Sequence, residues 1–246
     1  MLEGYKLTAD CHTHTIFSHG KGTVLDNAMA AKEQGLERLV ISDHGLNHIA
    51  FGLKRNRIEA YKKEIKEAAE KTGVDVLVGI ESNIIGYDGT IDIKENELKH
   101  FEWIIMGYHR AVWAKSFKEF FTLIIKNFFG NKFKPSKEQI EKNTMAYINA
   151  VNKYDIKVIS HMNYLMKVDC KRVAEACAKR GTLIELNGKK IDFTEKDVED
   201  MLSTDVKFIV DSDAHSKKRV GDVSVGIDFA LKHNIPFDRI VNIKKI

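Results

Sequence analysis

The chain has 246 residues, of which 43% are apolar and 30% charged, a composition typical of a globular protein with a substantial core. Its formal net charge of +4 is mild and its lysines are scattered, so composition gives no case for nucleic-acid binding. The sequence contains neither an apolar run of about eighteen residues nor a signal-peptide pattern, and we therefore expect a cytoplasmic protein without a membrane span. The three cysteines suit reduced thiols better than a disulfide framework.

Apolar runs of strand length alternate with segments of helical periodicity along the whole chain. The predicted strands are 5–9, 39–41, 76–80, 103–106, 157–160, 183–186 and 208–210. The predicted helices are 23–34, 57–71, 95–99, 136–153, 169–179, one that Thr194 caps with Asp197, and 223–232, after which a short apolar segment at 240–241 closes the chain. This α/β pattern predicts a parallel sheet with helices outside it. A distorted (βα)7 TIM-like barrel in a single domain is the first expectation. A doubly wound open sheet is the alternative, and the lack of a Gly-rich fingerprint after the first strand argues against it.

Histidines and acids follow the predicted strands at the point where each strand ends. His12 and His14 are two apart, so they share one face of the first strand with Asp10, while Cys11 points the other way. The carboxyl ends of the strands in a βα barrel meet at one face, which would bring these side chains together. The nine candidate metal ligands are His12, His14, His19, His44, Glu81, His109, His161, Asp213 and His215.

One ion with an open coordination position needs three or four protein ligands, so nine ligands imply two or three divalent ions. Imidazole and carboxylate ligands suit zinc, manganese or iron, among which zinc is favoured. A carboxylate can bridge two cations and an imidazole cannot. Glu81 is therefore the expected bridging ligand.

Several motifs in this order resemble the PHP (polymerase and histidinol phosphatase) family of metal-dependent phosphoesterases, in particular its small stand-alone YcdX-like phosphatases. The motifs are DCHTHT, SHG, SDHG, GIESNI with the following YDGTID, MGYHR, ISHMN and DSDAH. The resemblance implies one PHP domain over 1–246 with a trinuclear site on a distorted (βα)7 barrel. It also implies one metal held by His12, His14, Glu81 and Asp213, a second by His19, His44 and His215, and a third by Glu81, His109 and His161.

The sequence departs from the family pattern at three places. Met162 stands where a proline often follows the fifth-strand histidine, and Asp211 stands where the family often has glycine, so that Asp211 is an expected extra acceptor beside the ligands. The Phe-rich and Lys-rich insertion at about 111–134 is longer than the family resemblance implies. We weigh three interpretations of it: a helix packed on the barrel, a lid or subunit contact, and, with less support, peripheral membrane contact.

The predicted activity is hydrolysis of a small phosphate monoester by a metal-activated hydroxide. The alternatives are histidinol phosphatase proper, a phosphodiesterase or nuclease acting on nucleotides, and a metal-bound accessory module without activity. Asp10 and Asp43 are expected to orient imidazole N–H groups, or else to cap turns. Arg110 and Lys189 are expected to reach the substrate phosphate, or else to be solvated surface charges. The oligomeric state stays open.

Overall fold

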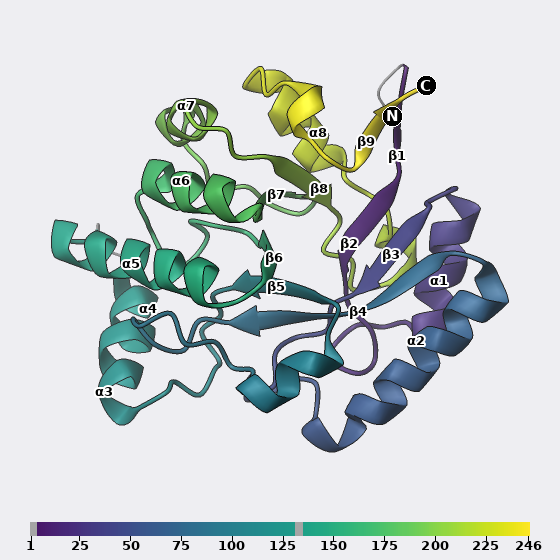
Figure 1. Ribbon diagram of the computed structural model, residues 1–246, viewed down its shortest axis with the longest axis horizontal. Coiled ribbons are helices and arrows are strands. Elements are labelled where there is room, and N and C mark those ends of the chain that lie inside the picture. Colours follow the sequence, from purple (N-terminus) through teal and green to yellow (C-terminus); the bar gives the residue numbers. More distant parts are fainter. Residues whose placement is uncertain (1–3, 131–134) are drawn as a thin grey trace.

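The structure, a computed structural model, describes residues 4–130 and 135–246. Its centre is a sheet of seven parallel strands whose spatial order follows the order of the chain. Figure 1 shows the helices outside these strands. The strands are β2 (Ala9–Thr13), β3 (Arg38–Ile41), β4 (Asp75–Asn83), β5 (Trp103–Gly107), β6 (Ile156–Ile159), β7 (Leu183–Asn187) and β8 (Phe208–Asp211).

Side chains join the first strand of this sheet, β2, to the last, β8. Asp10 accepts a hydrogen bond from the backbone N of Ser212 at 3.1 Å, and Asp211 accepts one from the backbone N of Cys11 at 2.7 Å. These contacts close the sheet into a barrel. The predicted distorted (βα)7 TIM-like barrel is confirmed. Asp211, which was predicted as an extra acceptor beside the ligands, accepts its hydrogen bond at this seam, from the backbone N of Cys11.

The N-terminal apolar segment lies outside the barrel. The sequence predicts one strand over 5–9, but β1 (Tyr5–Leu7) pairs antiparallel with β9 (Ile243–Lys245), and a separate strand, β2, carries the first histidines. Figure 1 shows the two ends of the chain side by side at this small sheet. The strand prediction at 5–9 was wrong in this respect because three apolar residues do not reveal a partner at the other end of the chain.

Helices cover the outside of the barrel, and their starts and stops follow the predicted signals. Ser136 and Thr194 accept hydrogen bonds from the first turns of their helices, and Gly73 and Gly181 end theirs with left-handed φ angles of 75° and 71°. The helices are α1 (Val24–Glu33), α2 (Ile58–Thr72), α5 (Lys137–Lys153), α6 (Cys170–Arg180), α7 (Glu195–Leu202) and α8 (Ser224–Lys232). The predicted helix at 95–99 is the short 3-10 helix η2 (Glu95–His100).

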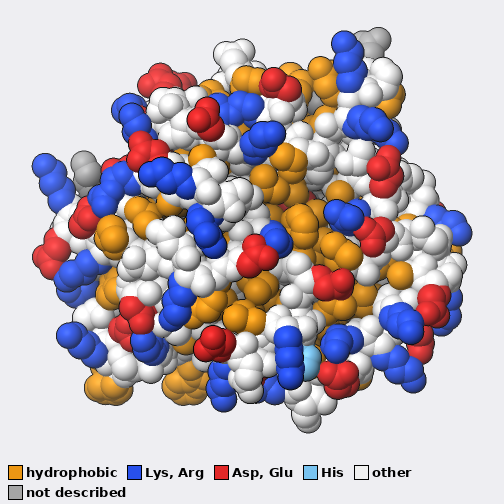
Figure 2. All heavy atoms as spheres, viewed as in Figure 1, with side chains coloured by type: hydrophobic (Ala, Val, Ile, Leu, Met, Phe, Trp, Pro, Cys, Tyr) orange, Lys and Arg blue, Asp and Glu red, His pale blue; other side chains and the backbone are white. Residues whose placement is uncertain are grey.

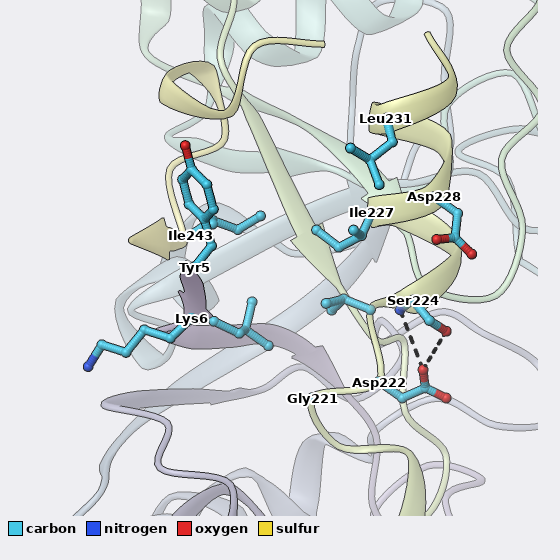
Figure 3. A pocket seen from close by; sticks show the side chains of 11 residues that line it. Tyr5, Lys6, Gly221, Asp222, Ser224, Ile227, Asp228, Leu231 and Ile243 are labelled. Carbon is cyan, nitrogen blue, oxygen red and sulfur yellow. Dashed lines mark hydrogen bonds between the residues drawn. The ribbon is translucent and has the colours of Figure 1, made fainter. Parts of the chain in front are cut away.

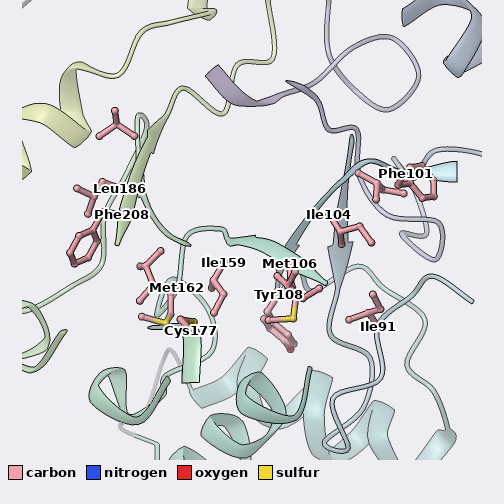
Figure 4. Close-up of a cluster of buried hydrophobic side chains, with 14 of the residues drawn as sticks. Ile91, Phe101, Ile104, Met106, Tyr108, Ile159, Met162, Cys177, Leu186 and Phe208 are labelled. Carbon is pink, nitrogen blue, oxygen red and sulfur yellow. The ribbon is translucent and has the colours of Figure 1, made fainter. Parts of the chain in front are cut away.

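Alternate residues of the strands pack on two sides. Ile104 and Met106 of β5 face the outer core between strands and helices, which Figure 4 shows, while Ile105 packs inside the barrel. The pairing of β2 with β3 shifts in register between Asp10 and Thr13. Because of this irregularity Cys11 packs with the interior cluster, which corrects the expectation that it points away from the side of the histidines.

The insertion forms one helical segment on the barrel. It consists of α3 (Phe117–Glu119), a π-helical stretch η3 (Phe120–Ile125) and α4 (Lys126–Gly130). Leu123 and Ile124 are buried, whereas Phe117 is 80% exposed. The segment is therefore packed on the barrel, as one interpretation predicted; the rest of the insertion, 131–134, lies outside the described residues.

The face of the molecule in Figure 2 has apolar side chains near its middle and intermixed acidic and basic side chains around them. Histidine is visible only at the lower edge of this face. Cys11, Cys170 and Cys177 are buried free thiols, as predicted. In the described ranges, no helix combines the length and the apolar character that crossing a membrane would require.

Candidate metal centre

A cavity of about 400 Å³ opens at the carboxyl ends of the barrel strands. Seven of the nine predicted ligands line it, and His12 and His14 lie fully buried behind them, 3.3 Å from Glu81 and from Asp213, respectively. The structure therefore brings together all nine side chains that the sequence singles out. The lining ligands are His19, His44, Glu81, His109, His161, Asp213 and His215.

Glu81 is at the centre of this group. It extends from β4 into the barrel and is only 1% exposed. Five imidazole nitrogens lie within 4 Å of its carboxylate oxygens: His161 Nε2 at 2.8 Å, His44 Nδ1 at 2.9 Å, His12 Nε2 at 3.3 Å, His109 Nε2 at 3.6 Å and His14 Nε2 at 3.7 Å. One carboxylate cannot satisfy five ring nitrogens by hydrogen bonding alone.

A second concentration of rings surrounds His14 and His215, whose ring centroids lie 4.3 Å apart. His19 approaches His215 to 4.1 Å between centroids, and His44 approaches His14 to 4.4 Å. Asp213 Oδ1 lies 3.3 Å from His14 Nε2, so a carboxylate also faces this side. Imidazoles and acids from different strand ends thus form one continuous cluster.

The donor atoms of this cluster fit divalent metal ions. Among the described residues, nine fully buried side-chain nitrogens and oxygens lack a hydrogen-bond partner, and five of these atoms belong to His12, His14, His44 and Glu81. Buried polar atoms without a partner are costly, so this concentration needs a ligand. Three sets of possible donor atoms lie within 4.8 Å of one another: His14–His44–His215, His12–His14–Glu81 and His44–Glu81–His109.

Charges inside the cluster shift its pKa values in opposite directions. Burial would lower the pKa of His12, but the carboxylates of Glu81 and Glu185 raise it well above its ordinary value. Burial and the neighbouring His44 lower the pKa of His14 well below the usual range. Burial would raise the pKa of Glu81, yet the imidazoles around it keep it far below normal, so this carboxylate is ionised.

Two predicted ligands hold an unusual backbone conformation. His161 has φ 31° and Asp213 has φ 49°, values that residues other than glycine rarely adopt. Such strain concentrates at functional sites, where the surrounding structure holds it in place. Gly107 on β5 makes room for one of these side chains, because a Cβ at Gly107 would lie only 2.9 Å from His161 Cε1.

A further pocket, of about 320 Å³, lies between β1, β9 and α8 (Figure 3). It is lined mainly by apolar residues such as Leu7, Ile227 and Leu231, and its polar groups include Asp222, which accepts hydrogen bonds from Ser224. It shares no lining residue with the histidine cavity. The chemistry-bearing side chains are therefore concentrated in the cavity at the strand ends.

A model of the PHP domain family matches residues 10–193. The chain belongs to the PHP family. A probable phosphatase of Caldanaerobacter subterraneus is 30% identical to this PHP protein, with 96% of this chain and 87% of the relative covered. The probable phosphatase YcdX of Shigella flexneri is 26% identical, with 95% of this chain and 89% of the relative covered. Membership and relatives together confirm the YcdX-like resemblance and make this PHP protein a phosphate-ester hydrolase.

Solved structures of low sequence identity share the fold of this PHP protein. The histidinol phosphate phosphatase of Lactococcus lactis, in complex with zinc, L-histidinol and phosphate, has a TM-score of 0.62 at 15% identity, with 93% of this chain and 94% of the other covered. A putative histidinol phosphatase of Listeria monocytogenes has a TM-score of 0.56 at 15% identity, with 87% and 97% covered. These likenesses support the barrel architecture.

Sequence reasoning missed the residues that hold the imidazoles of this PHP protein. Glu185 on β7 accepts a hydrogen bond from His12 Nδ1 at 2.6 Å, and Asn83 on β4 accepts one from His109 Nδ1 at 2.6 Å. Such bonds fix the ring orientation and leave Nε2 free for a metal. A signal was available, because Glu185 is a lone charge between the apolar residues Ile184 and Leu186 of a strand.

Asp10 and Asp43, which the sequence predicts to orient imidazole N–H groups, accept hydrogen bonds from other groups. Asp10 accepts from the backbone N of Gly221 at 2.8 Å as well as from Ser212, and Asp43 accepts from the backbone N and the hydroxyl of Thr15 at 2.8 and 2.6 Å. In the part of the chain that the structure describes, neither carboxylate hydrogen-bonds to an imidazole. Both carboxylates instead hold the backbone of loops that are distant in the sequence, so neither the expected orienting role nor a cap on their own turn describes them. Burial raises the pKa of Asp43 to about 6.

The two predicted phosphate-binding cations lie in different surroundings. Lys189 lines the cavity, with its Nζ 2.6 Å from His215 Nδ1 and 3.0 Å from Asp213 Oδ1. The guanidinium of Arg110 lies over the ring of Phe128 in the insertion, 4.8 Å from its centroid, and Arg110 is not among the residues that line the cavity. The geometry thus favours Lys189 over Arg110 as a contact for substrate.

Proposed function

We propose that this PHP protein hydrolyses phosphate monoesters of small metabolites with the help of two to three divalent ions, zinc being favoured. The observation that carries the proposal is the Glu81 carboxylate, which five imidazoles surround while buried donor atoms lack partners. In a trinuclear site, the family grouping gives one ion to His12, His14, Glu81 and Asp213, a second to His19, His44 and His215, and a third to Glu81, His109 and His161.

Ions held there would supply positive charge to phosphate oxygens and make water a stronger nucleophile at neutral pH. The chain's own residues prepare the site for them. Glu185 and Asn83 accept the Nδ1 protons of His12 and His109, so Nε2 of each ring, which faces Glu81, is the atom that would bind an ion. Lys189 adds a cation at the mouth of the cavity, where a phosphate dianion would enter.

The size of the cavity supports a small ester. About 400 Å³ is near the lower end of the range for small-molecule sites. Phe51 and Tyr164 flank the opening and are 46% and 42% exposed. A nucleic-acid chain would need a longer basic groove, and the lysines of this cavity, Lys189 and Lys190, are too few for one.

The decisive experiment offers the zinc-loaded protein a panel of histidinol phosphate, sugar phosphates, nucleoside monophosphates, an aryl phosphate and an aryl phosphate bis-ester. We expect release of inorganic phosphate from monoesters and none from the bis-ester. Hydrolysis of the bis-ester alone would replace the proposal with a phosphodiesterase. If protein with a full metal content hydrolysed no compound, the accessory module would replace it.

Replacing Lys189 with methionine is expected to raise KM for a phosphate monoester about tenfold, because a charged hydrogen-bond donor at the cavity is lost. Steady-state kinetics on an aryl phosphate measures this effect. Arg110→Met removes a cation of similar length outside the cavity lining and is the matched control, for which we expect an unchanged KM. An equal rise of KM in both variants would contradict the specific role of Lys189.

A further inference from the structure

The cavity contains a histidine that belongs to none of the predicted ligand sets. His48 lies in the loop that follows β3 and lines the cavity, and it is 8% exposed. Its ring stacks on His44 at 5.2 Å between centroids and lies 6.0 Å from His109. His48 is therefore next to two predicted ligands, yet it is absent from all three groups of convergent donor atoms.

The loop that carries His48 is held in place from both sides. Gly45 N donates to Glu81 O, and Leu53 N donates to His44 O, each at 2.8 Å. Ile49 N donates to the carbonyl of Ala111, also at 2.8 Å, and residues 48 and 112 form an isolated antiparallel bridge. The ring of His48 is thus presented by a backbone that is closed on itself at His44 and fixed to β4 and to the segment after β5. Such fixed side chains suit recognition of a ligand.

The hydrogen bonds of His48 also fix which nitrogen carries the proton. The backbone N of Phe51 donates to His48 Nδ1 at 3.1 Å, so Nδ1 is the acceptor and the proton of the neutral ring is on Nε2. Among the described residues, Nε2 of His48 has no hydrogen-bond partner. This atom is also absent from the fully buried polar atoms that lack a partner, so it is accessible from outside the protein core. His48 therefore offers an unused N–H donor to the cavity.

We propose that His48 binds substrate: its Nε2–H donates a hydrogen bond to an oxygen of the phosphoryl group other than the leaving-group oxygen. This inference depends on the proposed phosphatase function. The depth of the ring supports the choice of oxygen, because His48 is nearly buried beside His44 and His109, whereas the exposed side chains of Phe51 and Tyr164 flank the mouth through which a leaving group departs.

Two amide replacements separate this role from a structural one. In His48→Asn the side-chain oxygen can take the place of Nδ1 and accept from Phe51 N, but the donor at the position of Nε2 is lost. In His48→Gln the amide N–H₂ can take the place of Nε2, but the acceptor for the loop is lost. A substrate-binding role predicts that the Asn variant is impaired and the Gln variant is largely rescued, and a role in holding the loop predicts the reverse order.

The measurements are the dissociation constant of inorganic phosphate, kcat/KM for an aryl and an alkyl phosphate, and zinc content. For His48→Asn we expect phosphate to bind about tenfold more weakly, both esters to lose kcat/KM by a similar factor, and zinc content to stay at the wild-type value. His100→Asn, at a histidine outside the cavity, is the control and should behave as wild type.

Three results would each overturn the inference: wild-type phosphate affinity in His48→Asn, equal losses in both amide variants, or a loss of zinc. The proposed function would still stand in these cases, because the wild-type protein would be active. A selective loss with the alkyl ester would overturn the choice of oxygen. Failure of the proposed function has a different signature, because the wild-type protein itself would then hydrolyse none of the monoesters.

Discussion

The Glu81→Gln variant is expected to bind fewer zinc ions per chain than the wild type and to lose about 1,000-fold or more in kcat. The amide has nearly the shape of the carboxylate but carries no charge and cannot bridge two cations. Its effect is large because the carboxylate of Glu81 has five imidazole nitrogens within 4 Å. Elemental analysis of the purified protein and steady-state kinetics at saturating zinc measure the two effects.

The control for this variant is Glu97→Gln. Glu97 is a partly buried glutamate of the 3-10 helix η2 that pairs with Arg55 at 2.7 Å and does not line the cavity. We expect its replacement to leave zinc content and kcat unchanged. Full zinc content in Glu81→Gln together with a kcat within tenfold of wild type would show that Glu81 is not a metal ligand.

The barrel and the position of the cluster could be predicted because both depend on local patterns. Apolar runs that end in His44, Glu81 or His109 mark the carboxyl ends of strands, and parallel strands bring these ends to one face. Helix boundaries such as Thr194 and Gly181 follow capping rules that act within a few residues. Short-range chemistry therefore carries enough information for these features.

The remaining features depend on contacts between distant segments. The pairing of β1 with β9 joins the two ends of the chain, and the bond from His12 to Glu185 joins residues 173 positions apart. The spacing of residues in a single sequence does not show which distant residue each of these will contact. An ideal strand places Asp10 on the side of His12 and so predicts an imidazole partner, but Ser212 and Gly221 across the barrel seam provide the donors for its carboxylate.

The Glu185→Gln variant is expected to weaken zinc binding about 10- to 100-fold, with activity restored by excess zinc. The carboxylate accepts from His12 Nδ1 through Oε1, and from the backbone N of His161 at 2.7 Å and the amide of Asn187 at 3.0 Å through Oε2. A glutamine has only one acceptor oxygen. If that oxygen accepts from His161 N, the amide N–H₂ faces His12 Nδ1 and favours the tautomer with its proton on Nε2, the nitrogen that faces Glu81.

This tautomer would prevent His12 from binding a cation through Nε2 until the proton moved to Nδ1 and the amide turned to accept it, a rearrangement that costs zinc affinity but releases no proton. The zinc dissociation constant, measured by competition with a chromophoric chelator, should therefore be higher than in the wild type at neutral pH but should rise less steeply as pH falls. The carboxylate of Glu185 raises the pKa of His12 in the wild type, so zinc must displace a proton from that ring, whereas the variant lacks this charge and releases fewer protons. Rescue by excess zinc distinguishes this variant from Glu81→Gln, in which a direct ligand is lost. Unchanged zinc affinity in Glu185→Gln would mean that Glu185 only holds the backbone of His161 and the side chain of Asn187, and that the metal centre does not depend on the tautomer of His12.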